Sequence, residues 1–299
     1  VDRLESWIPQ LDGERRALAE DAVELPRLYM QWHSPGWYQE GDAEFDLLAD
    51  IVATGKTSRL YKSLVYEKQI AQDIFASQSS REMSGTFGIT ATAAPGHDLA
   101  ELEAAIDAEL KVLLAKGVTD REVSLSRTRF QANAVRELQQ IGGFGGKADR
   151  LNRYNVLVGD PGYLKADLAR YDAANAASVN AWMRRFIDLD RRGVLWIVPQ
   201  GKLAAAKLDV DRSQLPAGGR PAAFTPPAVQ AATLPNGLKL YLVEKHELPL
   251  VEARLVVNAG WADDPLDRQG TASLTADMLD EGVVGHDALA LSGAVEALG

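Results

Sequence analysis

The chain has 299 residues, of which 46% are apolar and 25% are charged, and its formal charge is −10. This is the composition of an ordinary globular protein with one large or two medium domains, and no apolar run approaches the roughly 18 to 20 residues that span a bilayer. The acidic balance, without a cluster of Lys and Arg, excludes nucleic acid as a partner, and the lack of cysteine excludes disulfides and thiolate catalysis.

The first part of the chain predicts a mixture of helices and strands. Residues 1–24 are polar and helix-prone, and a strand is expected over 27–32. Apolar residues at helical spacing predict a helix over 42–52, which Gly55 ends, and a second helix over 58–66.

Clear periodic patterns follow. Residues 85–94 alternate between apolar side chains and threonine, which predicts a half-buried strand. A stripe of leucines from Leu99 predicts a helix that Gly117 stops. Thr119 and Glu122 then form a capping box at the start of a long helix. The side chains expected to point inward from this helix are Val123, Phe130, Ala134, Leu138 and Ile141.

Residues 142–146 are nearly all glycine and break the chain. Shorter helices are expected after them, followed by a buried strand over 192–198. A phosphate-binding role for the glycines is disfavoured, because they follow a helix and lack a G-K-[S/T] ending. We interpret them as a break that lets two helices pack closely. The helical segments expected between this break and the strand are 151–156, 163–170 and 177–186.

Closely spaced prolines and glycines predict a linker over 201–228. Residues 1–200 are expected to form a complete αβ domain and residues 229–299 the partial start of another. The second part is predicted to open with a tight turn at 235–237 and a strand over 250–258. Helices are then expected over 269–281 and from His286 onward. Both ends of the chain look cut.

Several segments together resemble the pitrilysin/insulinase family of zinc metallopeptidases. The resemblance spans about residues 25–299, and it implies four homologous αβ units that close as two halves around a peptide. The fold implied is α+β: an antiparallel-rich sheet with helices packed on one face, followed by a truncated, degenerate second copy. The matching stretches are 58–68, 141–149, 159–162, 234–243, 256–265 and 269–272.

The resemblance also implies where zinc would be bound. In this family a helix carries H-x-x-E-H, in which two histidines bind zinc and the glutamate activates water. Ser273, Ala276 and Asp277 stand at these positions here. None replaces the family residue in kind, and the third ligand is expected beyond Gly299. We therefore predict no catalytic or metal residues in this chain and place the zinc in an upstream domain of the parent protein.

A substrate-side arginine and tyrosine of the family align with Val65 and Gln72. Neighbouring Tyr66 and Lys68 are candidates to compensate for them. Glycine-rich segments of non-catalytic subunits touch substrate in this family, which adds Phe144. The candidate substrate-binding residues are Tyr66, Lys68, Gln72 and Phe144.

The histidines offer no metal-binding pattern, since no two of them lie at i, i+4 on one helix. We interpret them as surface or locally bonded side chains. Two His-Asp pairs precede apolar helical stretches and indicate helix starts. Trp32 and Trp37 flank residues 33–36, which makes that segment a candidate for exposed aromatic surface. The four histidines are His33, His97, His246 and His286.

We predict a non-catalytic, chamber-forming, substrate-binding portion of a zinc-dependent endopeptidase that acts on peptides. The chain alone is expected to be inactive. The alternative is a peptide-binding or assembly module of a family member that has lost proteolysis, and an intact H-x-x-E-H upstream would favour the enzyme. A metalloenzyme with a new His/Asp arrangement rests only on the presence of those residues.

The expected partners are a peptide or unfolded polypeptide and the upstream zinc-bearing domain of the same protein. A homodimer of this fragment is also expected, because an incomplete sheet leaves an exposed edge. The absence of cysteine suits an oxidising compartment. We therefore expect a location in the bacterial periplasm or cell envelope.

Overall fold

The computed structural model describes residues 8–200, 227–246 and 249–298. It comprises two units, one formed by residues 1–201 with 253–299 and the other by residues 202–252. No helix in the described parts is long and apolar enough to cross a membrane. The predicted linker over 201–228 lies outside the described residues except at its last two positions, so the predicted domain boundaries stay predictions.

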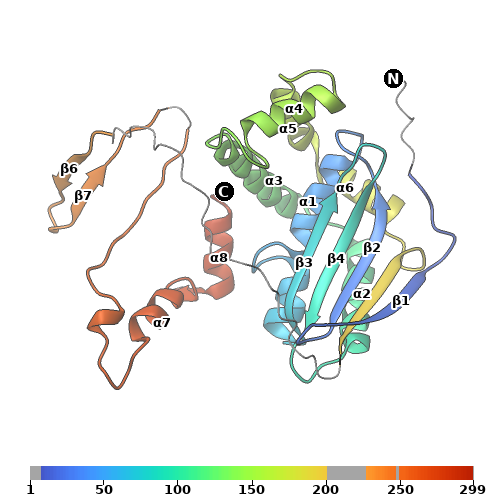
Figure 1. Ribbon diagram of the computed structural model, residues 1–299, viewed down its shortest axis with the longest axis horizontal. Helices are drawn as coiled ribbons and strands as arrows, with labels where there is room; N and C mark the ends of the chain where they lie inside the picture. Colours follow the sequence, from blue (N-terminus) through green and yellow to red (C-terminus); the bar gives the residue numbers. More distant parts are fainter. Residues whose placement is uncertain (1–7, 201–226, 247–248, 299) are drawn as a thin grey trace, which may run out of the picture. The chain divides into compact units, whose positions relative to one another are not determined.

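The first unit is built on a five-stranded sheet with the order β1-β5-β2-β4-β3 (Figure 1). Only β1 and β5 pair in parallel, and the other neighbours are antiparallel. The predicted α+β fold with an antiparallel-rich sheet is therefore confirmed. The strands are β1 (Arg15–Asp21), β2 (Arg27–Ser34), β3 (Ala71–Ser79), β4 (Gly85–Ala93) and β5 (Gly193–Pro199).

Strict alternation along β2 and β4 gives the sheet one apolar face. Leu28, Met30 and Trp32 of β2 are buried on it, beside Phe87 and Ile89 of β4. Register places Trp32 opposite Phe87 and Met30 opposite Ile89. Because successive strand residues point to opposite faces, the other side of the same strands is left to solvent.

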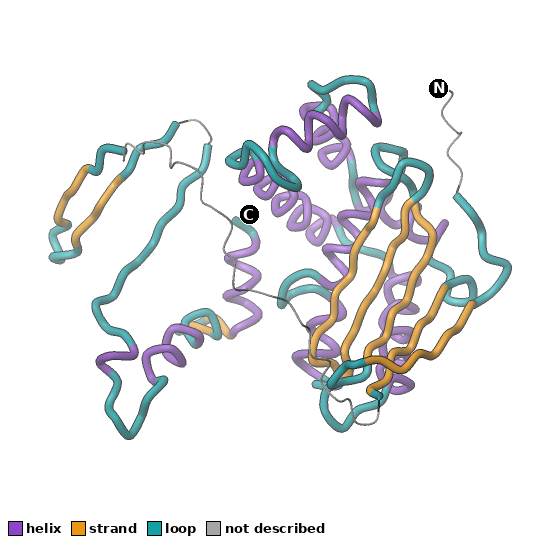
Figure 2. Tube along the Cα trace, viewed as in Figure 1, coloured by secondary structure: helices purple, strands orange, loops and turns teal. Residues whose placement is uncertain are grey.

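Helices cover the apolar face. α1, α2 and α6 contact the strands, and α3 and α5 pack against α1. Figure 2 shows these helices on one side of the sheet. The helices between β2 and β5 in the sequence are α1 (Asp42–Ala53), the π-helix η1 (Tyr61–Glu67), α2 (Leu99–Lys116), α3 (Asp120–Glu137), α4 (Lys147–Leu157), α5 (Leu164–Ala173) and α6 (Ala176–Phe186).

Side chains fix the starts of three helices as predicted. The Thr119 hydroxyl accepts a hydrogen bond from the backbone N–H of Glu122, whose carboxylate accepts one from the backbone N–H of Thr119. Asp98 caps α2 by accepting from the backbone N–H of Glu101. Asp287 caps α8 (Ala288–Glu296) in the same way. These contacts satisfy amide groups that have no partner inside the helix.

Three local expectations are wrong. Residues 15–21 form strand β1 instead of helix, because pairing with β5 outweighs their helical propensity. Ile141 is 77% exposed, because α3 ends at Glu137 before the apolar stripe does. Residues 250–258 form no strand, although their sequence alternates. A strand needs a hydrogen-bonded neighbour, which alternation alone does not supply.

The described residues after the first domain form short elements. A hairpin of β6 (Gln230–Thr233) and β7 (Lys239–Leu242) closes around the predicted turn at 235–237. It belongs to the second unit. The elements that follow, in the first unit, are the 3-10 turn η2 (Trp261–Asp263), α7 (Thr271–Asp277), β8 (Gly282–Val283), β9 (His286–Asp287) and α8.

Candidate functional site

The zinc-motif positions are not built to hold a metal. Ser273, Ala276 and Asp277 are all exposed on α7, a helix of seven residues. Zinc needs three or four N, O or S ligands that converge on one point, and this helix offers one carboxylate. Across the described residues no group of three or more His, Cys, Asp or Glu is placed to bind a metal ion. These residues do not fit zinc.

The candidate substrate-binding residues lie in two places. Tyr66, near the end of η1, is 47% exposed, and Gln72 is exposed near the start of β3. Lys68 lies between them, and its Nζ is 3.2 Å from Oε1 of Glu109. Since η1 and β3 contact each other, these three residues share one region. Phe144 is fully exposed in the loop between α3 and α4, and all four remain candidates.

Two of the four histidines make local contacts. His97 Nδ1 is 2.8 Å from a carboxylate oxygen of Glu101, and His246 Nε2 is 3.1 Å from one of Glu244. Both pairs are formed by near neighbours in the sequence. This geometry agrees with the interpretation of the histidines as locally bonded side chains.

The sheet face without helices presents a row of side chains that crosses all five strands. Strand register places Tyr29 of β2 between Leu195 of β5 and Thr90 of β4. Phe75 of the edge strand β3 lies opposite Thr90 and is 56% exposed. Ala17 of β1 lies opposite Leu195 and completes the row. The result is a shallow strip with an aromatic ring on each side of a hydroxyl group.

A second row runs beside the first and contains two glycines, one on each side of Gln31. Gln31 of β2 lies between Gly193 of β5 and Gly88 of β4, and Ser77 of β3 follows. A Cβ added at Gly88 would make ordinary contacts, at 3.7 Å from the Met30 carbonyl oxygen and 3.8 Å from Gln31 Cγ, and no clash. Glycine in a strand interior often marks a place where another backbone approaches closely.

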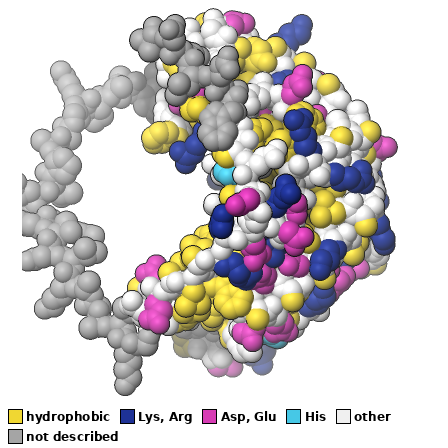
Figure 3. Space-filling model, turned by 90° about the vertical axis from the view of Figure 1, so that its right-hand side faces the viewer, with side chains coloured by type: hydrophobic (Ala, Val, Ile, Leu, Met, Phe, Trp, Pro, Cys, Tyr) yellow, Lys and Arg dark blue, Asp and Glu magenta, His cyan; other side chains and the backbone are white. Residues whose placement is uncertain are grey.

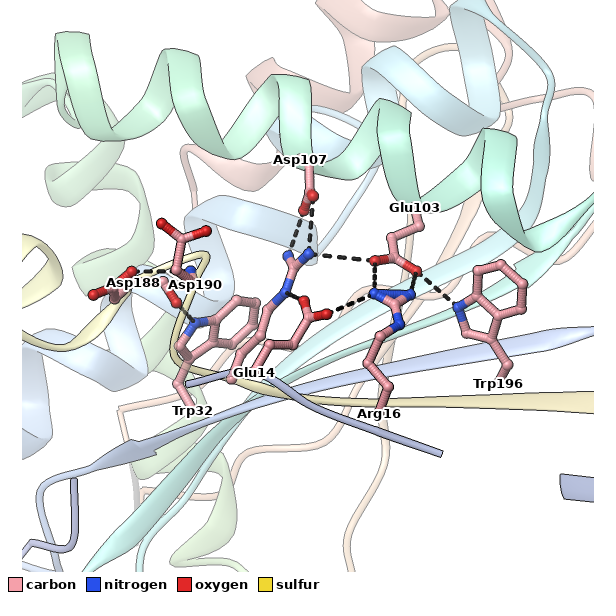
Figure 4. A network of polar contacts seen from close by, with 9 residues as sticks. Glu14, Arg16, Trp32, Glu103, Asp107, Asp188, Asp190 and Trp196 are labelled. Carbon is pink, nitrogen blue, oxygen red and sulfur yellow. Dashed lines mark hydrogen bonds and ion pairs between the residues drawn. The ribbon is translucent and has the colours of Figure 1, made fainter. Parts of the chain in front are cut away.

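A buried ion network holds the β1–β5 side of this sheet in place (Figure 4). Arg192, just before β5, is 3% exposed and binds Glu14, Glu103 and Asp107. Arg16 of β1 binds the same Glu103 carboxylate, with Nη2 2.5 Å from Oε2. Glu103 and Asp107 both belong to α2, so the network joins β1 and β5 to the helix layer.

Electrostatics favour the charged form of this arginine. Burial opposes the charge on Arg192, but hydrogen bonds to Asp107 and Glu14 outweigh that effect and raise the pKa of the guanidinium. The indole Nε1 of Trp196 also donates to Glu103, at 2.7 Å. Arg192 is therefore charged, and the ion pairs of the network hold the first strand in place.

The outer surface carries charges of both signs. Figure 3 shows Lys and Arg side chains interspersed with Asp and Glu on the face it displays. Nucleic-acid binding depends on clustered basic side chains that displace counterions. No single-sign cluster of basic side chains stands out among the described residues on this face.

Comparison with known proteins gives one family and several similar folds. The family model for the Peptidase M16 inactive domain matches residues 6–130. A protease from Helicobacter pylori superposes with a TM-score of 0.57 at 18% identity, over 64% of this chain and 46% of that one. A peptidase M16 inactive domain from Pseudomonas fluorescens gives 0.51 at 17% identity, over 67% and 46%.

An inactive peptidase domain from Bordetella parapertussis has a TM-score of 0.53 at 21% identity, over 63% of this chain and 98% of that domain. The chain thus spans about half the length of the first two relatives and nearly all of the third. At these identities the shared property is the fold. No curated protein sequence gives a significant match.

The matched segment includes β1 to β4, α1 and α2, which form most of the sheet and its helix layer. Residues 6–130 of this chain therefore resemble a peptidase M16 inactive domain. The resemblance to pitrilysin/insulinase-type zinc peptidases, as a piece without the zinc motif, is confirmed. The family model that matches describes a domain that is itself inactive.

Proposed function

We propose that this chain forms part of the wall of a substrate chamber in a zinc-dependent endopeptidase, with zinc supplied by an upstream domain of the same protein. The observation that carries this proposal is the helix-free face of the sheet. Its row of Leu195, Tyr29, Thr90 and Phe75 crosses the sheet beside a row centred on two glycines. Chemistry takes place elsewhere, because the zinc-motif positions hold no ligand set.

This surface suits an extended polypeptide of varied sequence. The Tyr29 and Phe75 rings offer apolar contact without selecting one side chain, and both rings are rigid, so little conformational entropy is lost on binding. The Thr90 hydroxyl and the Gln31 amide supply hydrogen bonds for peptide groups. Gly88 itself presents no side chain to an approaching backbone. A broad, weak, unselective surface is what a chamber wall requires.

The test is binding of an unfolded polypeptide, fluorescein-labelled β-casein, measured by fluorescence anisotropy. We expect the complete chain to bind it, and Tyr29→Ser and Phe75→Ser each to weaken binding several-fold. The control is Val112→Ser, which removes a 43% exposed apolar side chain from α2 in the helix layer. Variants that bind like the wild-type chain, or a control that weakens binding equally, would refute the proposal.

Proteolysis is tested separately by joining the chain to its upstream domain. Turnover of a quenched peptide that appears only in the joined protein, and that Phe75→Ser reduces, would support a chamber wall. Binding without turnover in the joined protein would instead favour a module that has lost proteolysis. The expected periplasmic or envelope location is also part of the proposal.

A further inference from the structure

A cavity of about 340 Å³ lies among the helices of the first domain, away from the helix-free face of the sheet. Its walls come from α1, α3, α4 and α5, from the loop before α1 and from the end of β3. This volume is near the lower limit for small-molecule sites, so it fits a side chain or chain end. The residues used below are Tyr38, Asp46, Gln78, Phe130 and Tyr171.

The positive charges that line the cavity are already paired. Arg170 lies 3.1 Å from Asp42 and 2.5 Å from Asp167. Arg153 binds Asp149 at 2.6 Å, and Arg150 binds Glu137. None of these guanidinium groups is left to attract an anion.

One carboxyl group of the cavity lacks a cation. Asp46 of α1 accepts a hydrogen bond from the Tyr171 hydroxyl at 2.6 Å, and among the described residues it has no ion pair. Gln78 also lines the cavity, and its buried Oε1 has no hydrogen-bond partner in the described part of the chain. Both groups are acceptors, and the arginines that line the cavity are paired with other carboxylates, so neither acceptor has a cationic donor of its own among the described residues.

Aromatic rings beside these acceptors add to the attraction for a cation. Phe130 and Tyr171 stack with centroids 4.7 Å apart. Arg170 already lies over the rings of Tyr38 and Tyr171, at 5.2 and 5.5 Å from their centroids, so of these three rings Phe130 is the one with no cation over it among the described contacts. Ring faces are negative and attract ammonium groups, most strongly where water is excluded.

We propose that this cavity binds a primary ammonium group, carried by a lysine side chain or by the amino terminus of a peptide. Asp46 supplies the charge, Gln78 Oε1 accepts a hydrogen bond, and Phe130 offers an aromatic ring in the cavity lining. The assignment rests on the proposed function only in taking a peptide as the carrier. It gives the domain a point of attachment for basic or free-ended substrates.

Protonation of Asp46 gives the site a measurable signature. Burial, together with the nearby charges of Asp42 and Asp167, raises the pKa of Asp46 to about 8, against the lowering effects of Tyr171 and Arg170. The carboxyl is therefore mainly neutral at pH 7. A bound ammonium favours the ionised form, so binding at pH 7 should release about one proton, and the affinity for a lysine side chain, which stays charged, should rise between pH 6.5 and 8.5.

The experiment uses three pentapeptides of alanine with different centres and ends. The first has a central lysine and blocked termini, the second a central norleucine and a free amino terminus, and the third a central norleucine and blocked termini. Calorimetry on the complete chain should show binding of the first, the second or both, and no binding of the third. The two binding arms identify the source of the ammonium group.

The key variant is Asp46→Asn, which keeps an acceptor for Tyr171 and removes the charge. It should weaken binding by about tenfold or more, since one charge at close range is lost. Asp172→Asn is the control, because Asp172 is exposed and neighbours Tyr171 in sequence without lining the cavity. It should change the dissociation constant less than about twofold.

Equal binding of the third peptide, or an unchanged affinity in Asp46→Asn, would overturn the proposal. So would failure of all three peptides to bind. If Asp46→Asn does not fold, the proposal is tested on the wild-type chain alone. Calorimetry in buffers of different ionisation enthalpy then measures proton release on binding, and the absence of proton release counts against the site. Binding of β-casein at the sheet is scored independently, so either proposal can fail alone.

Discussion

The guanidinium of Arg192 contacts both carboxylate oxygens of Asp107, with Nη1 2.5 Å from Oδ1 and Nη2 2.9 Å from Oδ2. One residue precedes β5 and the other lies on α2, so this pair joins the sheet to its helix layer. Two parallel hydrogen bonds fix the relative orientation of both groups. The first strand depends on the same arginine, because Glu14, just before β1, binds its Nε.

We predict that Arg192→Ala lowers the free energy of unfolding by about 3 kcal/mol, because it leaves Asp107 without a cation and leaves Glu103 and Glu14 with Arg16 alone. Arg191→Ala is the matched control, since Arg191 is 57% exposed and lies 3.6 Å from Asp188. The control should cost no more than about 0.5 kcal/mol. Urea unfolding of both variants is the measurement. Similar losses would mean that the network does not stabilise the sheet.

Alanine substitutions at Gly41 and Gly96 distinguish the cost of a steric clash from the cost of backbone strain. Both have positive φ, 88° and 90°, but a Cβ at Gly41 would lie 2.5 Å from the Trp182 ring, whereas one at Gly96 meets nothing within 4 Å. Gly96→Ala should therefore cost about 1 kcal/mol, the strain alone. We expect Gly41→Ala to cost at least about 2 kcal/mol more, because the indole must move. Equal midpoints of urea unfolding for the two variants would contradict this expected difference.

The raised pKa of Asp46 predicts a pH dependence of stability. The folded chain keeps a proton on Asp46 up to about pH 8, while the unfolded chain loses it near pH 4. The folded state binds more protons in this window, so the free energy of unfolding falls as pH rises through it.

Asp46→Asn removes that titration. Relative to the wild-type chain, the variant should gain up to about 2 kcal/mol between pH 6 and pH 8. The measurement is urea unfolding at several pH values, and Asp172→Asn should follow the wild-type curve. A wild-type profile parallel to that of Asp46→Asn would show that Asp46 is ionised at neutral pH.

The chain by itself should neither hold stoichiometric zinc nor cleave peptides. Ser273, Ala276 and Asp277 offer neither two histidine ligands nor a base for the water. The combined change Ser273→His, Ala276→Glu and Asp277→His adds two ligands and the base, yet still lacks a third ligand. We expect weak zinc uptake and no hydrolysis even from this variant. About one tightly held zinc per wild-type chain, with turnover abolished by a chelator, would refute the assignment.

The sequence predicted those elements whose signals are local. Alternation over 85–94 and the capping box of Thr119 and Glu122 both appear in the structure as expected. The sequence shows no clear strand pattern for β3, although Ile74 and Ala76 are buried in it. Its exposed side is irregular, and a register shift interrupts its start. The cavity around Asp46 could not be anticipated, since its walls come from residues 37 to 171. Trp37, which the sequence marks as a candidate exposed aromatic residue, lines this cavity and is 37% exposed.

By itself the sequence indicated the resemblance to zinc peptidases, the α+β class and the residues at the zinc-motif positions, because these depend on ordered segments and on residue identity at single positions. Tertiary structure alone decided that residues 15–21 form an edge strand. It also decided that Arg192 is shared among three carboxylates and that Asp46 is left without a cation. Such properties depend on which groups meet across long sequence separations. Burial then sets their energy, since a charge inside the protein interacts far more strongly with its neighbours than one in water.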